Sequence, residues 1–341
     1  MRQPALPTTL TRRGFLGQAS ALTAAGACPA LASAQNADGW PVRPVRVLVG
    51  SNAGSPVDVP TRGVTQRLSE RFSQPFVIDN RAGAGGILAA EAVVKAAPDG
   101  YTLLSAGPAE IVNNYFIWQN AGRVFPYDPA KDLTPIAMIQ RGPGVLVVGA
   151  KLGIATWSEL ADYLRRNPGK GSIGVVQLGA STHLASELLK RESKLEFVVV
   201  PYRGMAEMLS DLREARLTMM LSTPFETIDF VRQGTLKALA VSHIRRIEGF
   251  EAVPTFGELG LPEVVNLPFL GLFAPAGTPA AVVAKLNRAV AEEIAGSPPG
   301  KPALTPFGRE APVMSPVELK DYIAKERERW GRVIQEANIR I

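Results

Sequence analysis

The sequence feature that most constrains the fold is a regular alternation of short apolar runs with amphipathic stretches from Arg43 onward. Residues 45–49 are typical of a buried strand, and a turn rich in Gly, Ser and Pro follows at 50–56. A helix comes next, with Val64 and Leu68 on one apolar face. Further strands are predicted at 76–78, 101–104, 145–148, 197–200, 219–222, 236–241 and 271–274. This βαβα order predicts an α/β fold with helix-covered, mainly parallel sheets.

Local capping patterns mark where several helices begin. Three S/T-x-x-E capping boxes occur, at Thr156 and Glu159, Thr223 and Glu226, and Ser315 and Glu318. Asp58 stands where an N-cap belongs, with Pro60 in the first turn, and another helix follows Thr278 and Pro279.

A chain of 341 residues has enough material for about two domains of ~100–200 residues each. The Pro/Gly-rich stretch 141–144 and the Leu267-Pro268 region are the best candidates for crossings between them. With two crossings, the C-terminal helices return to the first domain. We therefore expect lobe 1 at 40–141 plus 267–341, and lobe 2 at 142–266.

The first 34 residues have the character of an export leader. They contain Arg2, Arg12 and Arg13 but no acidic residue, and residues 11–16 match the twin-arginine signal. The Ala-rich stretch that follows is too short to span a bilayer, and residues 32–34 supply a small-x-small cleavage pattern. We expect residues 1–34 to be a twin-arginine signal peptide of a periplasmic protein.

Two other interpretations of this leader stay open. One is a disordered, Ala-rich tail. The other is a lipoprotein acylated at Cys28, although residues 25–27 lack the large aliphatic residue usual before such a cysteine.

Composition argues against several function classes. Cleavage after Ala34 would remove three arginines and no acid, so the net charge would fall from +6 to +3. The remaining Lys and Arg are dispersed among acids, so we expect no nucleic-acid partner. The chain has one cysteine and two histidines, which argues against a metal site. No later segment has 18 consecutive apolar residues, so we expect the mature chain to be soluble.

Catalytic motifs are missing from the sequence. The glycine turn at 83–86 fails the G-x-G-x-x-G pattern because position 88 is Leu88, and no P-loop or G-x-S-x-G motif occurs. Ser181 and His183 are two residues apart, so their side chains do not face each other on a helix. We therefore expect no catalytic residues and no cofactor.

Eight segments together resemble the Bug family, the solute-binding receptors of tripartite tricarboxylate transporters. They are residues 44–49 with Gly54, Asp58 and Arg62, then 79–86, 98–104, 126–133, 200–204, 236–241, 253–255 with 260–262, and 271–279. The resemblance implies a type II periplasmic-binding fold with two lobes, two crossing strands and a ligand cleft. It also implies a small carboxylate as ligand and transporter membrane subunits as partners.

Helix N-termini give such a receptor a physical means of binding an anion. They present unpaired N–H groups and a partial positive charge, so they can hold a carboxylate without Lys or Arg. Each terminus contributes only ~0.3–2 kcal/mol, whereas micromolar binding needs roughly 8 kcal/mol. Several convergent donors are therefore required.

The resemblance places the ligand on two loops. In lobe 1 the loop follows the first strand and comprises Ser51, Asn52, Ala53, Gly54 and Ser55. In lobe 2 the loop precedes a helix and comprises Gln177, Leu178, Gly179, Ala180 and Ser181, with Ser181 able to cap the helix. Apolar residues replace most of the polar groups usual in this second loop, which favours a larger or more apolar ligand than a tricarboxylate.

Other positions are less decisive. Ser222 is a candidate pocket hydroxyl, and Phe269 either lines the cleft or packs in the core. Glu110 either favours a cationic group on the ligand or is a solvated loop acid. We expect His183 to be packed and hydrogen-bonded, and Asp58 to cap a helix because a carboxylate would repel an anion.

The sequence thus predicts a monomeric periplasmic receptor that closes over a small organic carboxylate and delivers it to a transporter. One alternative is a sensor in which the same module docks on a signalling partner. A more distant alternative is an exported hydrolase. The identity of the ligand is not fixed by these residues.

Overall fold

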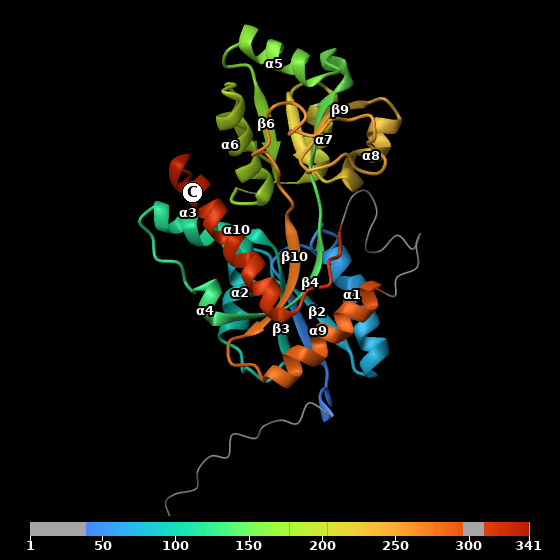
Figure 1. Ribbon diagram of the computed structural model, residues 1–341, viewed down its shortest axis with the longest axis vertical. Coiled ribbons are helices and arrows are strands. Elements are labelled where there is room, and N and C mark those ends of the chain that lie inside the picture. Colours follow the sequence, from blue (N-terminus) through green and yellow to red (C-terminus); the bar gives the residue numbers. More distant parts are fainter. Residues whose placement is uncertain (1–38, 177, 203, 296–309, 341) are drawn as a thin grey trace, which may run out of the picture. The chain divides into compact units, whose positions relative to one another are not determined.

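The computed structural model describes residues 39–340 apart from 177, 203 and 296–309. The predicted leader, with Cys28, lies outside the described residues, and so does Gln177. The described chain forms two five-stranded sheets with helices packed on them (Figure 1). This is a two-lobed α/β fold, and we call the sheets with their helices the first and second lobe.

The sheet of the first lobe has the order β2-β1-β3-β10-β4. Its strands are β1 (Val45–Val49), β2 (Phe76–Asn80), β3 (Thr102–Ala106), β4 (Leu133–Arg141) and β10 (Phe269–Pro275). Strand β1 is parallel to both β2 and β3, whereas β10 is antiparallel to β3 and β4.

The sheet of the second lobe repeats this plan with the order β7-β6-β8-β5-β9. Its strands are β5 (Val145–Gly149), β6 (Ser172–Val175), β7 (Val198–Pro201), β8 (Met219–Ser222) and β9 (Leu236–Val241). Strand β6 is parallel to β7 and β8, whereas β5 is antiparallel to β8 and β9.

Both sheets are mixed, but four of the five strands in each run in the same direction, which confirms the prediction of mainly parallel sheets. Parallel neighbours need a long crossover, usually a helix, on one face of the sheet. The one antiparallel strand of each sheet, β10 in the first and β5 in the second, is the strand that the chain enters directly from the other sheet. The strand ends put the passages between the sheets at 142–144 and 242–268. The residue bounds of the two lobes stay a prediction.

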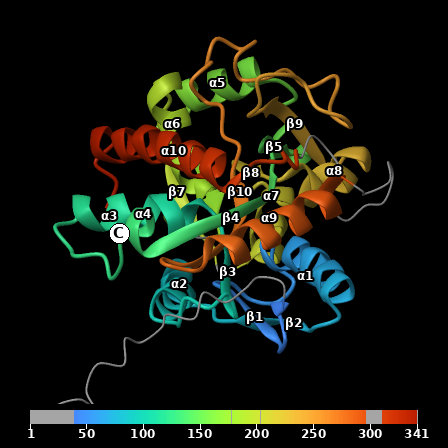
Figure 2. The same cartoon turned by 60° about the horizontal axis from the view of Figure 1, so that its bottom comes forward.

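Each sheet is covered on both faces. In the first lobe, one face carries α1 (Asp58–Phe72) and α9 (Ala280–Ala295), which lie side by side in Figure 2. The other face carries α2 (Ile87–Val94), α3 (Asn114–Asn120) and α10 (Pro316–Glu336). In the second lobe, α5 (Trp157–Arg166) and α6 (Ser181–Ser193) cover one face, and α7 (Met205–Arg213) and α8 (Pro224–Arg232) cover the other.

Short helices complete the connections. They are the 3₁₀ turns η2 (Ala84–Gly86) and η4 (Ala150–Leu152), the π-helical segment η3 (Ala109–Asn113) and α4 (Pro129–Asp132). None of the helices among residues 39–295 and 310–340 is long and apolar enough to cross a membrane.

All three predicted capping boxes form, at the starts of α5, α8 and α10. The prediction for Asp58 was wrong, because the N-cap of α1 is Val57 and Asp58 is the first helical residue. The Asp58 carboxylate instead accepts the N–H of Gly54, four residues earlier in the chain.

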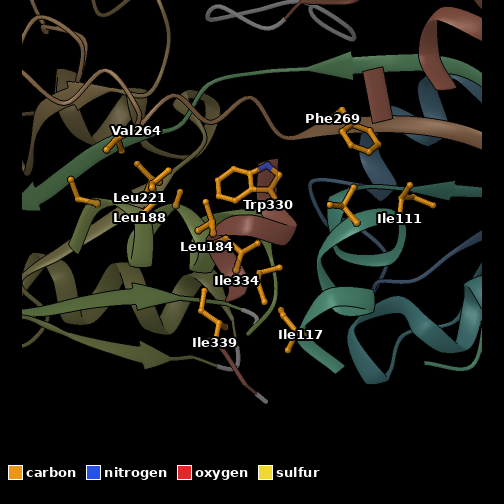
Figure 3. Close-up of a cluster of buried hydrophobic side chains, with 14 of the residues drawn as sticks. Ile111, Ile117, Leu184, Leu188, Leu221, Val264, Phe269, Trp330, Ile334 and Ile339 are labelled. Atoms are coloured by element: carbon orange, nitrogen blue, oxygen red, sulfur yellow. The ribbon is translucent and has the colours of Figure 1, made fainter. Parts of the chain in front are cut away.

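One hydrophobic cluster runs through both lobes by way of α10. Trp330 and Ile334 of α10 pack with Ile117 of the first lobe and with Leu184 and Leu188 of the second (Figure 3). Two passages and a shared helix therefore join the lobes.

Candidate functional site

The loop after β1 is held in place by its own polar side chains. The hydroxyls of Ser51 and Ser55 lie 2.6 Å apart, within hydrogen-bond distance. Asn52, Ala53 and Gly54 are exposed between them. Gly54 has a φ of 79°, which a residue with a Cβ adopts only with strain. The predicted lobe 1 loop is thus an ordered turn whose tip is accessible.

Asp58 is the anchor of this loop. Its buried carboxylate accepts the N–H of Gly54 (2.8 Å), the Nδ2 group of Asn80 (2.9 Å) and two bonds from Arg62 (2.7 and 3.0 Å). Asn80 also donates to the carbonyl of Ser51 at 2.9 Å. Burial would raise the pKa of Asp58, but the hydrogen bonds from Arg62, Gly54 and Asn80 outweigh it and lower that pKa.

The amides at the tip of the loop differ in availability. Gly54 N–H is bound by Asp58, and Ser55 N–H donates to the carbonyl of Asn52 at 3.2 Å. Within the described part of the chain, the N–H groups of Asn52 and Ala53 make no hydrogen bond. These two amides lie at the exposed tip of the loop, where a ligand can reach them.

The end of β1 also touches the start of α2. A Cβ on Gly50 would lie 2.6 Å from the Cα of Gly86, and Gly86 itself has a φ of 86°. Gly86 is the N-cap of α2, which has no side-chain cap. Only glycine fits at either position. The backbone directly after β1 therefore packs closely against the N-terminus of α2, which has no side-chain cap.

Glu110 fills the space beside these two glycines. Its Oε2 accepts the N–H of Gly107 at 3.1 Å, and the residue is buried. Burial raises the pKa of Glu110 to about 7, against the effect of its backbone hydrogen bonds. Glu110 is therefore not a solvated loop acid, which was one of its two expected roles.

The loop before α6 meets the first lobe. The Nδ2 group of Asn113, in η3, donates to the carbonyl of Gly179 at 2.9 Å. The Nδ2 group of Asn266 donates to the carbonyl of Ser181 at 3.1 Å. The N-cap of α6 is Ala180, without a side-chain cap, so the prediction of Ser181 as a cap was wrong. The first amides of α6 therefore have no side-chain acceptor.

The side chain of His183 holds this loop in position through a hydrogen bond. Its Nδ1 accepts the N–H of Gly179 at 3.0 Å, and its ring is buried. Burial lowers the pKa of His183, which favours the neutral ring that can accept a hydrogen bond. The expected packed, hydrogen-bonded histidine is confirmed.

Segment η3 is the part of the molecule that both regions contact. Glu110 of η3 lies against Gly86 at the start of α2, and Asn113 of η3 donates to the carbonyl of Gly179. Asn114, the first residue of α3, donates to the carbonyl of Gly85 at 3.2 Å. Asn113 is 1% exposed, and its Oδ1 has no hydrogen-bond partner among the described residues. A buried acceptor without a partner is costly, so this atom is suited to a ligand or water donor.

Two predicted residues have other partners. The hydroxyl of Ser222 donates to Oε2 of Glu226 at 2.6 Å, inside the capping box of α8. Phe269 is buried, and its ring packs edge-on against Tyr322 with centroids 5.8 Å apart. The described contacts of Ser222 therefore belong to the start of α8 and those of Phe269 to the hydrophobic core.

Sequence reasoning missed the positioning roles of Asn80 and Asp58 and the contact made by Asn113. The only local signal was a pair of asparagines, Asn113 and Asn114, directly after an apolar stretch. Among the described residues, no group of three or more His, Cys, Asp or Glu side chains could hold a metal ion.

Comparison with known sequences gives one family. The model of the tripartite tricarboxylate transporter family receptor matches residues 61–339. A protein from the tcbD-tcbE intergenic region of Pseudomonas sp. (strain P51) is 35% identical over 334 residues, covering 98% of this chain and 96% of the relative. Protein BugT of Bordetella pertussis is 31% identical and covers 91% of this chain and 94% of its own length.

Solved structures give the same result. A protein of R. palustris solved with adipate superposes with a TM-score of 0.78 at 34% identity, covering 87% of this chain and 98% of that one. MatC from Rhodopseudomonas palustris with bound malate gives 0.77 at 31% identity, covering 86% and 100%. The superpositions cover nearly the whole length of both solved structures.

Proposed function

Because this chain belongs to the family of tripartite tricarboxylate transporter receptors, we propose that it captures a small organic carboxylate and delivers it to a transporter of that type. The family consists of solute-binding receptors rather than enzymes. The proposed site comprises the loop Ser51–Ser55, the start of α2, η3 and the loop before α6.

The observation that carries this proposal is the contact between Asn113 and Gly179. It joins η3, which touches the start of α2, to the loop that opens α6. Two helix N-termini without side-chain caps thus lie on either side of η3. We propose that these two N-termini and the amides of Asn52 and Ala53 together bind the carboxylate.

The bound acids of the two structural neighbours support the ligand class. One was solved with adipate and the other with malate, both of which are dicarboxylates. In this chain Val176 and Leu178 expose 39% and 37% of their surface beside Gly179. We therefore propose an acid with an apolar chain rather than a tricarboxylate.

A thermal-shift screen tests the ligand class. The panel contains mono-, di- and tricarboxylates, amides and aromatic acids, with native mass spectrometry to confirm stoichiometry. We expect at least one carboxylate to raise the midpoint of unfolding while the amides do not, because ligand binding stabilises only the folded state. Absence of a shift with every carboxylate would contradict the proposal.

A matched pair of glycine variants tests the location of the site. Gly54 and Gly153 both have positive φ, at 79° and 71°, and a Cβ on either would meet no atom within 4 Å. Gly54→Val and Gly153→Val therefore impose similar backbone strain. We expect only Gly54→Val to abolish stabilisation by the acid, and equal stabilisation in both variants would show that the loop is not part of the site.

The leader supports a periplasmic location through the twin-arginine route. Arg12 and Arg13 form the pair that this route reads. Replacing both with Lys should leave the precursor in the cytoplasm, as shown by immunoblotting of periplasmic and cytoplasmic fractions. Undiminished export of the double variant would argue against this route.

Delivery to membrane subunits is a separate part of the proposal. Cells lacking this chain should lose uptake of the radiolabelled acid and regain it from a plasmid copy. Uptake that is unchanged by the deletion would favour the sensor hypothesis instead. We propose a monomer, which light scattering during size exclusion measures directly.

A further inference from the structure

The carboxyl group of Glu110 lies at the centre of the proposed site. A Cβ on Gly86 would lie 2.0 Å from Oε1 of Glu110, and a Cβ on Gly50 would lie 3.0 Å from the same atom. Gly50 directly precedes the loop Ser51–Ser55, and Gly86 is the N-cap of α2. The carboxyl thus fills the space between two of the backbone segments that offer amides to a ligand.

Among the residues that the structure describes, no cation pairs with Glu110. Its carboxyl accepts the backbone amides of Gly107 and of Glu110 itself, and the residue is 7% exposed. The hydroxyl of Tyr127 donates to the backbone carbonyl of Glu110, not to its carboxyl. Arg327 of α10 donates to the carbonyl of Ile111 and stacks on the ring of Tyr115 in α3.

Charged groups on the other elements around η3 have partners of their own. Glu91 of α2 pairs with Lys95, and Lys131 of α4 pairs with Asp128 at 3.2 Å. Asp132 of α4 accepts the N–H of Asp128 at 2.7 Å. In the second lobe, the nearest titratable group of the facing loop is the buried His183, which binds Gly179. No ion pair among the described residues involves Glu110.

A buried carboxyl without a cation is easily neutralised. Burial raises the pKa of Glu110 to about 7, so near neutral pH both forms are populated. A ligand carboxylate among the neighbouring amides would disfavour the ionised form further, because two like charges at close range repel. The neutral acid, by contrast, can donate a hydrogen bond to an anion.

We propose that Glu110 is a specificity-determining residue: it meets the ligand as a neutral acid, so that capture of a carboxylate takes up one proton. This inference rests on the proposed function. The proton comes from the buffer and binds one carboxyl oxygen of Glu110, while the ligand stays ionised. Carboxylates are then bound most tightly at mildly acidic pH.

Isothermal titration of the purified protein with adipate and with malate tests the inference. Titrations in phosphate and in Tris between about pH 6 and pH 9 give the number of protons taken up, because the two buffers differ in ionisation enthalpy. We expect uptake to approach one proton per ligand above pH ~7, and Kd to rise about tenfold per pH unit there.

Two variants sharpen this test. Glu110→Gln keeps a hydrogen-bond donor but cannot titrate, so its Kd should not change with pH and its proton uptake should vanish. Glu91→Gln removes an acidic charge from α2 outside the site and should behave as the wild type. A carbon-13 NMR titration of the carboxyl groups in wild-type protein follows Glu110 without any substitution and should show its pKa rising on ligand binding.

The possible results of these experiments distinguish a failure of this inference from a failure of the proposed receptor function. Binding of adipate or malate without proton uptake, or with proton release, would overturn the role of Glu110 while leaving the receptor function intact. Proton release would indicate a ligand that places a cation beside an ionised Glu110. Failure of both acids and of the wider carboxylate panel to bind would contradict the function and the inference together.

Discussion

At the residue scale, Glu110 links stability to pH. Its pKa in the folded protein, about 7, lies above the unfolded value of 4.5. The folded state therefore holds the proton more tightly, and this contribution to stability is complete below pH ~4.5 and is lost as the pH rises through ~7. Above that pH, an ionised carboxyl is buried at a cost.

Glu110→Gln should therefore stabilise the protein selectively at alkaline pH. We expect the free energy of unfolding to rise by on the order of 1–3 kcal/mol at pH ~8, with a much smaller change at pH ~5. Urea unfolding at the two pH values measures this difference. An effect of equal size at both would mean that the carboxyl does not titrate in this range.

His183 has the opposite effect on the pH dependence of folding stability. Its pKa in the folded protein lies below the usual 6.5, so the unfolded state binds the proton more tightly. Stability is then present above pH ~6.5 and falls as the pH drops. His183→Gln, which keeps an acceptor for the N–H of Gly179, should flatten this loss of stability in acid. An unchanged pH profile in His183→Gln would contradict this role.

Contacts between individual residues also show which structural features a local sequence pattern cannot predict. The apolar run at 45–49 and the three capping boxes depend on near neighbours in the chain, and each formed as expected. The contact of Glu110 with Gly50 and Gly86 brings together residues 24 to 60 positions apart, and no local pattern encodes it. Asp58 of α1 illustrates the same limit, because its partner Asn80 is 22 residues away at the end of strand β2.

At the element scale, η3 was the part of the site that sequence reasoning did not anticipate. Pro108 and Glu110 are compatible with a helix start, but a π-helical turn has no composition of its own that would identify it in the sequence. Such segments are often found at functional sites. Here η3 holds Asn113 against Gly179 of the second lobe and Glu110 against Gly50 and Gly86 of the first, so one short segment touches both lobes.

The capping box of α5 provides a prediction away from the site. Thr156 accepts the N–H of Glu159 at 3.2 Å. Thr156→Ala should lower the free energy of unfolding by about 0.5–2 kcal/mol, since it removes an N-cap. Chemical denaturation measures the loss, and Ser158→Ala on the exposed side of α5 should leave stability nearly unchanged. Ligand-induced stabilisation should persist in both variants, and its loss in Thr156→Ala would contradict the assignment of the site.

At the scale of the whole molecule, α10 makes the two lobes one folding unit. Trp330 lies in a hydrophobic cluster that includes side chains of both lobes, and Arg191 of α6 forms an ion pair with Glu336 at 2.6 Å. The strands were predicted one by one from local apolar runs, but this shared core joins residues far apart in the chain, so no local pattern indicates it.

Trp330→Ala should therefore weaken both lobes together. We expect a loss of about 3–5 kcal/mol, the range for removing a buried large aromatic side chain. Calorimetry and circular dichroism should report one shifted transition, and Phe225→Ala at an exposed aromatic should cause a far smaller change. Two separated transitions in Trp330→Ala, with one unshifted, would show that the cluster does not couple the lobes.

The central claim is that a carboxylate binds where the loop Ser51–Ser55, the start of α2, η3 and the start of α6 meet. A crystal structure of the protein grown with the acid that stabilises it most tests this directly. We expect a carboxylate group about 2.7–3.2 Å from the amides of Asn52, Ala53 or the first turn of α6, with Glu110 beside it. The acid bound elsewhere, with these amides facing only solvent, would contradict the account.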